Sequence, residues 1–157
     1  MAAAERAAAL TPYRAEHSFD WDAALALIRR AFAGMEGRIN PPSSLHHFTA
    51  RDLQAGEFWC IGVPPVACVL LTRKPGALYL GKLAVEPGRT RQGLARALIQ
   101  TAETRARAFG LPALELQTRI ELTANHAIFH ALGFQEIART AHAGFDRPTA
   151  VTYRKDL

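Results

Sequence analysis

The chain has few cysteines and no long apolar stretch. Its 157 residues include two cysteines, Cys60 and Cys68, which are too few and too close together for the disulfide framework of a small secreted domain. Their spacing also differs from that of zinc ligands, so we expect two reduced thiols in the core. No apolar run approaches the roughly 18 residues that a membrane-spanning helix requires, which argues against insertion into a membrane.

The N-terminal segment lacks the pattern of a signal peptide. Residues 1–10 are rich in alanine, but Glu5 and Arg6 interrupt them and no basic region precedes an apolar stretch. Hydrophobic residues make up 49% of the chain, which is enough to form a core. We therefore expect a cytoplasmic protein in which residues 1–10 form a disordered or frayed arm and residues 11–157 form a single domain.

The common nucleotide and metal motifs are also missing. There is neither the Gly-Lys-Ser/Thr of a P-loop nor the three-glycine dinucleotide fingerprint. His126 and His130 could share a helix face, but no third ligand has suitable spacing, so we expect no metal. The 19 Lys and Arg residues exceed the 14 Asp and Glu residues, for a formal charge of +5. Because no nucleic-acid recognition motif accompanies this charge, we expect no nucleic acid partner and leave open a polyanionic small molecule.

The hydrophobic spacing switches between helical and extended along the first half of the chain. Trp21–Phe32 carries apolar residues at helical spacing after Asp20, a good N-cap. Ser43 or Ser44 could cap a short second helix, which Thr49 and Asp52 restart as a capping pair. The pattern after Gly56 predicts a meander of three strands, at residues 58–61, 66–72 and 78–85.

The second half alternates helices and strands. Residues 94–109 form the best-marked helix, residues 113–118 a strand and residues 125–132 a short helix, and residues 134–139 and 150–154 are two final strands. This order predicts an α/β fold with a mixed sheet of about six to seven strands and about four helices. The connection from strand 78–85 through the long helix should be a parallel crossover, which puts a ligand site at the carboxyl end of that strand.

The loop that follows strand 78–85 favours an anion. It runs from Val85 to Ala95, contains Gly93 where the backbone can approach a ligand closely, and leads into the N-terminus of the long helix. The first N–H groups of a helix are unpaired and carry partial positive charge. Arg89, Arg91 and Arg96 add formal charge, although an ordinary basic loop would have the same composition.

Two motifs in this region resemble the GNAT superfamily of acyl-CoA N-acyltransferases. The first is Leu83-Ala84-Val85-Glu86-Pro87 followed by Thr90-Arg91-Gln92-Gly93-Leu94-Ala95, in which Thr90 replaces the usual Arg or Gln. The second is Asn125-His126-Ala127-Ile128-Phe129-His130-Ala131-Leu132-Gly133-Phe134. The likeness covers roughly residues 21–157.

The resemblance implies a GNAT-like fold and acetyl-CoA as cosubstrate. The backbone of Leu83 and Val85 is expected to pair with the pantetheine arm, and the loop is expected to wrap the pyrophosphate. The residues that the resemblance assigns to cofactor binding are Leu83, Ala84, Val85, Arg89, Arg91, Gln92, Gly93, Leu94, Ala95, Arg96, Asn125 and Phe129.

The resemblance also implies direct attack of an amine on the thioester, with the Val85 N–H stabilising the oxyanion. Two departures from the family leave the proton transfers unassigned. Phe129 stands where many relatives have a Tyr that protonates the leaving thiolate, and Tyr79 stands where some have a catalytic Glu. The remaining candidates for the base lie in two loops, and among them Glu36 is our first choice; the others are Arg38, His46, His47, His142, Asp146 and Arg147.

Three functions from different classes stay open at this point. The first is an N-acetyltransferase acting on a primary amine of a small molecule or protein. The second, which Phe129 and Tyr79 suggest, is a catalytically weak acyl-CoA-binding regulatory module. The third is a basic nucleic-acid-binding domain, which lacks a motif. The sequence names neither the acceptor nor the oligomeric state, and a homodimer is left open.

Overall fold

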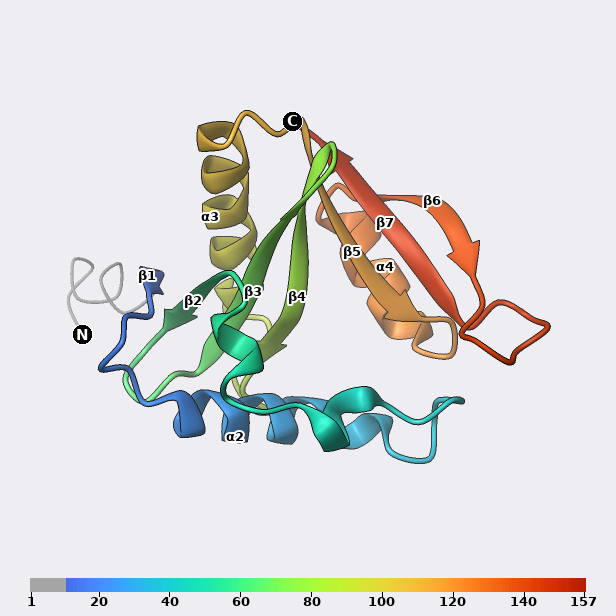
Figure 1. Ribbon diagram of the computed structural model, residues 1–157, viewed down its shortest axis with the longest axis horizontal. Coiled ribbons are helices and arrows are strands. Elements are labelled where there is room, and N and C mark those ends of the chain that lie inside the picture. The colour runs from blue at the N-terminus through green and yellow to red at the C-terminus, as the bar shows by residue number, and fades with distance from the viewer. Residues whose placement is uncertain (1–10) are drawn as a thin grey trace.

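The computed structural model (Figure 1) describes residues 11–157, so the expected arm at residues 1–10 lies outside the described residues. Seven strands form one mixed sheet in the order β1-β2-β3-β4-β5-β7-β6. Their bounds are β1 (Tyr13–Arg14), β2 (Glu57–Ile61), β3 (Ala67–Lys74), β4 (Ala77–Val85), β5 (Ala113–Arg119), β6 (Gln135–Thr140) and β7 (Ala150–Asp156). The predicted α/β class and mixed sheet are confirmed.

The β2-β3-β4 meander is antiparallel, as its closely spaced turns predict. The β4 and β5 strands are parallel neighbours, and helix α3 (Leu94–Ala108) connects them. The predicted crossover is therefore confirmed. The two-residue strand β1, which pairs with the outer edge of β2, was not predicted, because two residues carry no detectable alternation.

Helix α2 (Trp21–Phe32) begins where its cap predicts. The Asp20 carboxylate accepts a hydrogen bond from the Ala23 N–H at 3.1 Å, which satisfies one of the free donors of the first turn. The apolar face of α2 packs on one side of β2, β3 and β4. The buried residues of this cluster are Ala24, Leu27, Ile28, Leu53, Phe58, Cys60, Cys68, Leu70 and Ala84.

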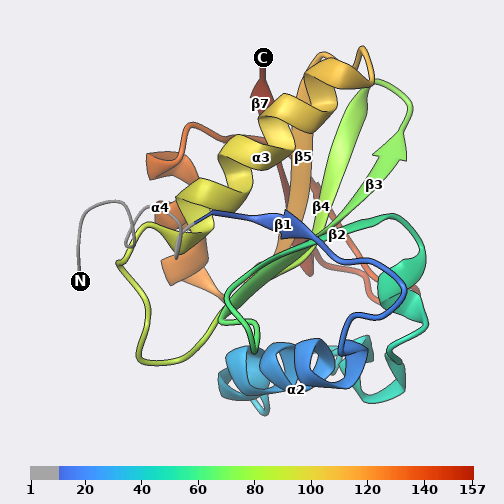
Figure 2. The same ribbon diagram turned by 90° about the vertical axis from the view of Figure 1, so that its left-hand side faces the viewer.

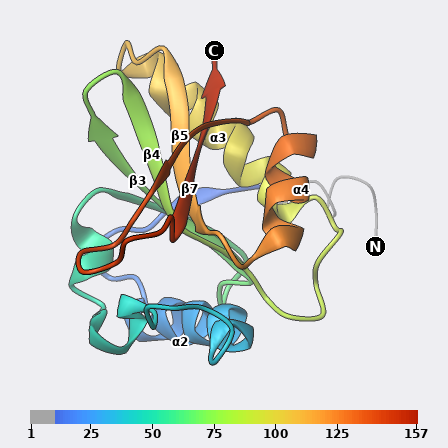
Figure 3. The same cartoon turned by 90° about the vertical axis from the view of Figure 1, so that its right-hand side faces the viewer.

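Helices α3 and α4 (Thr123–Ala131) cover the opposite face of the sheet. The larger core cluster joins Leu98 and Ala102 of α3 to the sheet residues Leu80, Leu114 and Val151. Figure 2 shows α2 set apart from α3 and α4, and Figure 3 shows the same separation from the opposite side. The sheet is therefore covered on both faces, as its apolar strands require.

The prediction of a second α-helix after α2 was wrong. Residues 11–157 contain three α-helices rather than about four, and the segment expected to form the extra one holds two 3₁₀ turns, Ser44–His47 and Asp52–Gln54. The predicted caps are present: Ser43 Oγ accepts from the Leu45 N–H at 3.1 Å, and the Asp52 carboxylate accepts from the Thr49 N–H at 2.7 Å. Phe48 between them is extended, so neither turn gains the length that an α-helix needs.

The two cysteines are buried free thiols, as predicted. Cys60 and Cys68 face each other across β2 and β3, and burial raises the pKa of Cys60 to about 12. Within residues 11–157, no helix is long and apolar enough to cross a bilayer.

Candidate active site

Strands β4 and β5 are paired at one end and separate at the other. Leu78 pairs with Leu114 and Tyr79 with Glu115, and no further pair joins the two strands. The lower ends of β4 and β5 diverge in Figure 1. A cleft of about 490 Å³ lies at this divergence, lined by Leu80–Leu83 of β4, by Leu116–Arg119 of β5 and by loops on both sides of the sheet. It is the main candidate site of the described chain because it lies at the carboxyl ends of two parallel strands.

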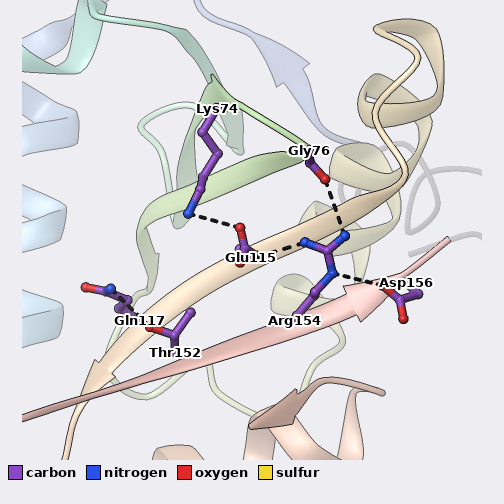
Figure 4. A network of polar contacts seen from close by, with 7 residues as sticks. All are labelled: Lys74, Gly76, Glu115, Gln117, Thr152, Arg154 and Asp156. Carbon is purple, nitrogen blue, oxygen red and sulfur yellow. Dashed lines mark hydrogen bonds and ion pairs between the residues drawn. The ribbon is translucent and has the colours of Figure 1, made fainter. Parts of the chain in front are cut away.

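A buried carboxylate holds the paired end together. Glu115, 6% exposed, forms an ion pair with Lys74 from the β3-β4 hairpin at 3.0 Å. Arg154 of β7 approaches the other Glu115 oxygen at 3.9 Å and also donates to Asp156 at 2.9 Å. Figure 4 shows these side chains converging from three strands beside the hairpin. The network holds the paired ends of β4 and β5 together, so the two strands separate only toward their carboxyl ends.

The cleft edge of β4 carries a bulge. Cys68 faces Ala84, but Leu70 faces Gly81, so β4 has one residue more than β3 in this interval. Lys82 in the bulge has φ of 52°, which a residue with a side chain seldom adopts. The Lys82 carbonyl accepts a long bond from the Cys68 thiol at 3.6 Å. Such a bulge re-aims side chains beside a site.

The Val85 N–H points away from β3. The next residue, Glu86, donates its N–H to the Val66 carbonyl of the neighbouring chain segment at 2.8 Å. Successive N–H groups of a strand point to opposite edges. The Val85 N–H therefore points to the edge of β4 opposite β3, where β5 is no longer paired. Leu83 has the same parity and lines the cleft. These are the two backbone positions that the sequence assigned to cosubstrate pairing, whereas the Ala84 side chain is buried against α2.

The loop after β4 forms a concave turn of backbone N–H groups. Three of its residues have positive φ: Gly88 at 89°, Arg91 at 63° and Gly93 at 80°. The Ala97 N–H donates to the Gly93 carbonyl at 3.0 Å, so the N–H groups before Ala97 lie outside the ladder of α3. A Cβ added to Gly93 would meet no atom of residues 11–157 within 4 Å, apart from its own chain neighbours. The loop therefore has open space beside its donors, which fits a pyrophosphate.

Side chains at this loop fix its start and surround its opening. Glu86 accepts from Arg30 of α2 at 3.1 and 2.8 Å, which ties the loop to the end of that helix. Arg89 donates to the Gln92 side chain at 3.1 Å. Arg91 and Arg96 are exposed, Ala95 is partly exposed, and Leu94 is buried in the core below the loop. Arg96 and Gly93 also border a second hollow of about 590 Å³ along α3.

Helix α4 contributes Asn125 and Phe129 to the cleft. The Asn125 amide donates to the Thr118 hydroxyl at 3.2 Å, which fixes the start of α4 against the end of β5. The Phe129 ring packs 6.2 Å from Phe134 and 6.0 Å from Tyr153, measured between centroids. Phe129 therefore closes the cleft on the α4 side without a proton to donate.

The opposite wall of the cleft comes from the last residue of α2 and from the segment after it. Its lining residues are Phe32, Met35, Ser43, Ser44, Leu45 and Phe48. Arg119, at the end of β5, donates to the carbonyls of Pro41 and Pro42 at 2.6 and 3.3 Å. Glu121 accepts from the Asn40 N–H at 3.0 Å. These bonds hold the segment over the open end of the cleft.

Of the predicted base candidates whose side chains are described, only His142 lines the cleft. Its Nδ1 contacts the Thr149 hydroxyl, whose oxygen also accepts from the His142 N–H at 2.8 Å and lies 3.4 Å from the Thr140 carbonyl. If the hydroxyl donates to that carbonyl, the ring carries its proton on Nδ1 and leaves Nε2 free to accept one.

The other predicted candidates whose side chains are described lie outside the cleft wall. Glu36 is exposed and follows Met35, which does line the cleft; its role as base stays a prediction. Arg38, His47, Asp146 and Arg147 are exposed and do not line the cleft, and the side chain of His46 lies outside the described residues. Burial raises the pKa of Tyr79, which opposes its use as a base.

The cleft contains two cations that the sequence analysis did not assign. Lys82 interrupts an otherwise apolar strand directly after Gly81, and a glycine inside a strand is a signal for a bulge. Arg119 ends β5 and gave no such signal. Burial lowers the pKa of both side chains.

The two histidines of α4 have different surroundings. His126 Nε2 lies 3.2 Å from the Arg119 carbonyl, and His130 is exposed. No group of three or more His, Cys, Asp or Glu side chains among residues 11–157 is arranged to hold a metal ion.

Comparison with known proteins gives a family and a common fold. The chain matches the acetyltransferase (GNAT) family over residues 15–134, whereas no curated protein sequence matches it. Among solved structures, it is similar to an acetyltransferase from Streptococcus agalactiae, with a TM-score of 0.73 and 17% identity over 93% of this chain and 97% of the other.

Two further structures have the same fold. The ribosomal-protein-S18-alanine N-acetyltransferase from Escherichia coli has a TM-score of 0.69 and 24% identity, over 93% of this chain and 92% of the other. A GNAT family acetyltransferase from Elizabethkingia anophelis with acetyl-CoA bound has a TM-score of 0.66 and 15% identity, over 94% of this chain and 97% of the other. These structures share the fold, and the family match over residues 15–134 shows that the chain belongs to the GNAT family of acyl-CoA-dependent acyltransferases.

Proposed function

We propose that residues 11–157 act as one acetyltransferase domain, which transfers an acetyl group from acetyl-CoA to a primary amine by direct attack in a ternary complex. The main support for this proposal is that the free edge of β4 and the loop of unpaired N–H groups follow each other directly in the chain. The free edge of β4 ends at Val85, and the N–H groups of the following loop open on space beside Gly93. One extended molecule with a pyrophosphate and a thioester could contact both.

The pyrophosphate would be held mainly by backbone donors. Arg91 and Gly93 have positive φ angles, as in the backbone turns that form anion-binding concavities, and the N-terminus of α3 adds its dipole. Arg89 and Arg96 would supply formal charge for the phosphates. Because backbone donors dominate, the Thr90 departure from the family pattern has little effect on this assignment.

The Val85 N–H would stabilise the oxyanion. Attack on the thioester carbonyl moves negative charge onto its oxygen, and a fixed donor aimed at that position accelerates the reaction, typically by about a hundredfold to a thousandfold. The direction of the Val85 N–H toward the free edge of β4 supports this role. The strand holds the donor in place, so little reorganisation accompanies the reaction.

His142 is our proposed base. An ammonium acceptor must lose a proton before it attacks, and no Asp or Glu of the described chain lines the cleft. An imidazole exchanges protons near neutral pH, and Thr149 orients this ring through its hydroxyl. Phe129 has no donor group, so the departing thiolate would take its proton from solvent.

The test is the release of free CoA thiol from acetyl-CoA in the presence of a panel of primary amines. The proposal predicts release that depends on the amine and saturates with its concentration. Tight acetyl-CoA binding without amine-dependent release would contradict catalysis and would favour the acyl-CoA-binding module.

A further inference from the structure

The charged side chains that line the cleft all have positive charge. Among the lining residues of the described chain, Lys82 and Arg119 are cationic, His142 carries an imidazole, and none is Asp or Glu. A polycationic acceptor would find no counter-charge in this wall. An acceptor that carries a negative group would be attracted to it.

Two of these three side chains already have partners. The Arg119 guanidinium donates to the carbonyls of Pro41 and Pro42. The His142 ring contacts the Thr149 hydroxyl. Both groups are therefore held in the wall by the protein itself, and their bonding capacity toward a substrate is reduced.

The ammonium of Lys82, unlike Arg119 and His142, has no side-chain hydrogen bond among the described residues. Its Nζ lies 4.6 Å from the centre of the Phe48 ring, and within residues 11–157 it forms neither an ion pair nor a side-chain hydrogen bond. Asp52 attracts it electrostatically, but that carboxylate already accepts from the Thr49 N–H and hydroxyl at 2.7 and 3.0 Å. The ring face orients the ammonium without satisfying its three N–H donors.

The surroundings of Lys82 make an unpaired charge costly. The residue is partly buried, and its burial lowers the pKa of the ammonium. Lysine is seldom desolvated without a partner, because the charge loses hydration that nothing replaces. An anion that entered the cleft would replace that hydration and gain a charge-assisted hydrogen bond.

The position of Lys82 suits a substrate rather than the cosubstrate. Its side chain reaches Phe48, on the wall formed by the segment after α2, whereas the phosphate loop begins after Val85, the last residue of β4. Lys82 is three positions before Val85 in the strand, which corresponds to about 10 Å of extended chain. One small molecule could therefore place an anion at Lys82 and an amine near the Val85 N–H.

We propose that Lys82 binds a carboxylate of the amine acceptor, so that the acceptors of this protein are amino acids or short peptides carrying both a primary amine and a carboxylate. This proposal rests on the proposed acetyltransferase function. One unpaired ammonium matches a single negative charge better than a phosphate dianion, which is why we name a carboxylate.

The test compares each acid with its own amide. Wild type, Lys82→Met and Lys82→Arg are assayed with glycine, β-alanine, 4-aminobutyrate, L-lysine and glycylglycine, and with the carboxamide of each. The quantity measured is the ratio of kcat/KM for acid over amide. Comparing this ratio between variants cancels the different basicity of the two amines. Arg51→Met removes an exposed positive charge three residues after Phe48 and outside the lining of the cleft, and it controls for the change in net charge.

Wild type is expected to favour at least one acid over its amide. Lys82→Met should reduce that preference by roughly tenfold to a hundredfold, the range of one charge-assisted hydrogen bond. Lys82→Arg should retain most of it, and Arg51→Met should leave it unchanged. Efficient acetylation with an acid-to-amide ratio that Lys82→Met does not alter would overturn the role of Lys82 while leaving the acetyltransferase function intact.

A binding measurement keeps the proposal testable if no amine is acetylated, which would count against the proposed function instead. N-acetyl-β-alanine and its carboxamide are titrated against wild type and Lys82→Met, each saturated with CoA, with the heat of binding as readout. Preferential binding of the acid, lost in Lys82→Met, supports the carboxylate site. Equal binding of the two compounds, or none, overturns it.

Discussion

Tyr79 on β4 pairs with Glu115 on β5, and the two strands separate immediately after this pair. Glu115 is held from its other sides by Lys74 and Arg154. The cleft, the free edge of β4 and the direction of the Val85 N–H all follow from this separation. The site is therefore built chiefly from backbone geometry, and side chains adjust what it binds.

Gly93 should be essential for CoA binding. A side chain there would enter the open space beside the loop donors, and its φ of 80° strains any residue with a Cβ, at a cost of about 1–3 kcal/mol. We expect Gly93→Val to abolish measurable CoA binding in a calorimetric titration while the protein stays folded. Gly110 has φ of 70° and equally open space at the other end of α3, so Gly110→Val controls for strain. CoA binding of wild-type strength by folded Gly93→Val would disprove the proposed phosphate site.

Phe129→Tyr should leave turnover unchanged or raise it. The ring lines the cleft and packs on Phe134 and Tyr153, so an added hydroxyl could deliver the proton that Phe129 lacks. The measurement is kcat with acetyl-CoA and the best amine from the panel. A large loss of kcat with unchanged CoA affinity would instead assign Phe129 a packing role that the hydroxyl disrupts.

The base can be assigned by comparing two loops. His142→Gln should lower turnover of a high-pKa amine by about a hundredfold to ten-thousandfold. The loss should shrink as pH rises, because the free amine becomes abundant without catalysis. Glu36→Gln is the parallel variant, since Glu36 lies outside the cleft wall; it should change turnover by less than about threefold. If Glu36→Gln instead gave the large, pH-dependent loss, Glu36 would be the base, as first predicted from the sequence.

The Glu57–Arg105 pair predicts how stability depends on pH. Glu57 is buried and accepts from Arg105 at 2.8 and 2.6 Å, and these bonds lower the pKa of its carboxyl from the ordinary 4.5. A lowered folded-state pKa means that the contribution is fully present above pH 4.5 and is lost as pH falls through the folded value. Glu57→Gln should cost about 1–3 kcal/mol from neutral pH down to about pH 4.5, and progressively less at lower pH.

Chemical denaturation at a series of pH values measures this contribution. Glu136→Gln, which removes an exposed pair with Arg139, is the matched control and should have a smaller effect. A difference between wild type and Glu57→Gln that stays constant from neutral pH down to pH 3 would contradict the assignment.

The sequence predicted those parts of the fold that local patterns determine. Asp20 capped α2 as expected, and glycine and proline turns separated the strands of the meander. The second helix was mispredicted because its caps are real but Phe48 between them is extended, a conformation that depends on the surrounding packing. The conformation of this segment depends on how it packs over the cleft, and capping residues alone do not predict that packing.

For the candidate site, backbone positions were easier to predict than side-chain roles. The motif around Gly93 placed the loop at the start of α3, but the positive φ of Arg91 and Lys82 is visible only in three dimensions. The sequence offered seven base candidates from two loops and had no means of telling which of them enter the cleft. Lys82 was overlooked because a single cation within a strand looks like an ordinary exposed residue until its unpaired position in the wall is known.

The proposed reaction moves an acetyl group from a thioester to an amine. The most direct measurement uses ¹³C-labelled acetyl-CoA, with free thiol and labelled N-acetyl product quantified in the same reaction by absorbance and mass spectrometry. We expect equal amounts of both, and Gly93→Val should suppress the two together. Thiol release without labelled amide, or binding of acetyl-CoA with neither product, would contradict it.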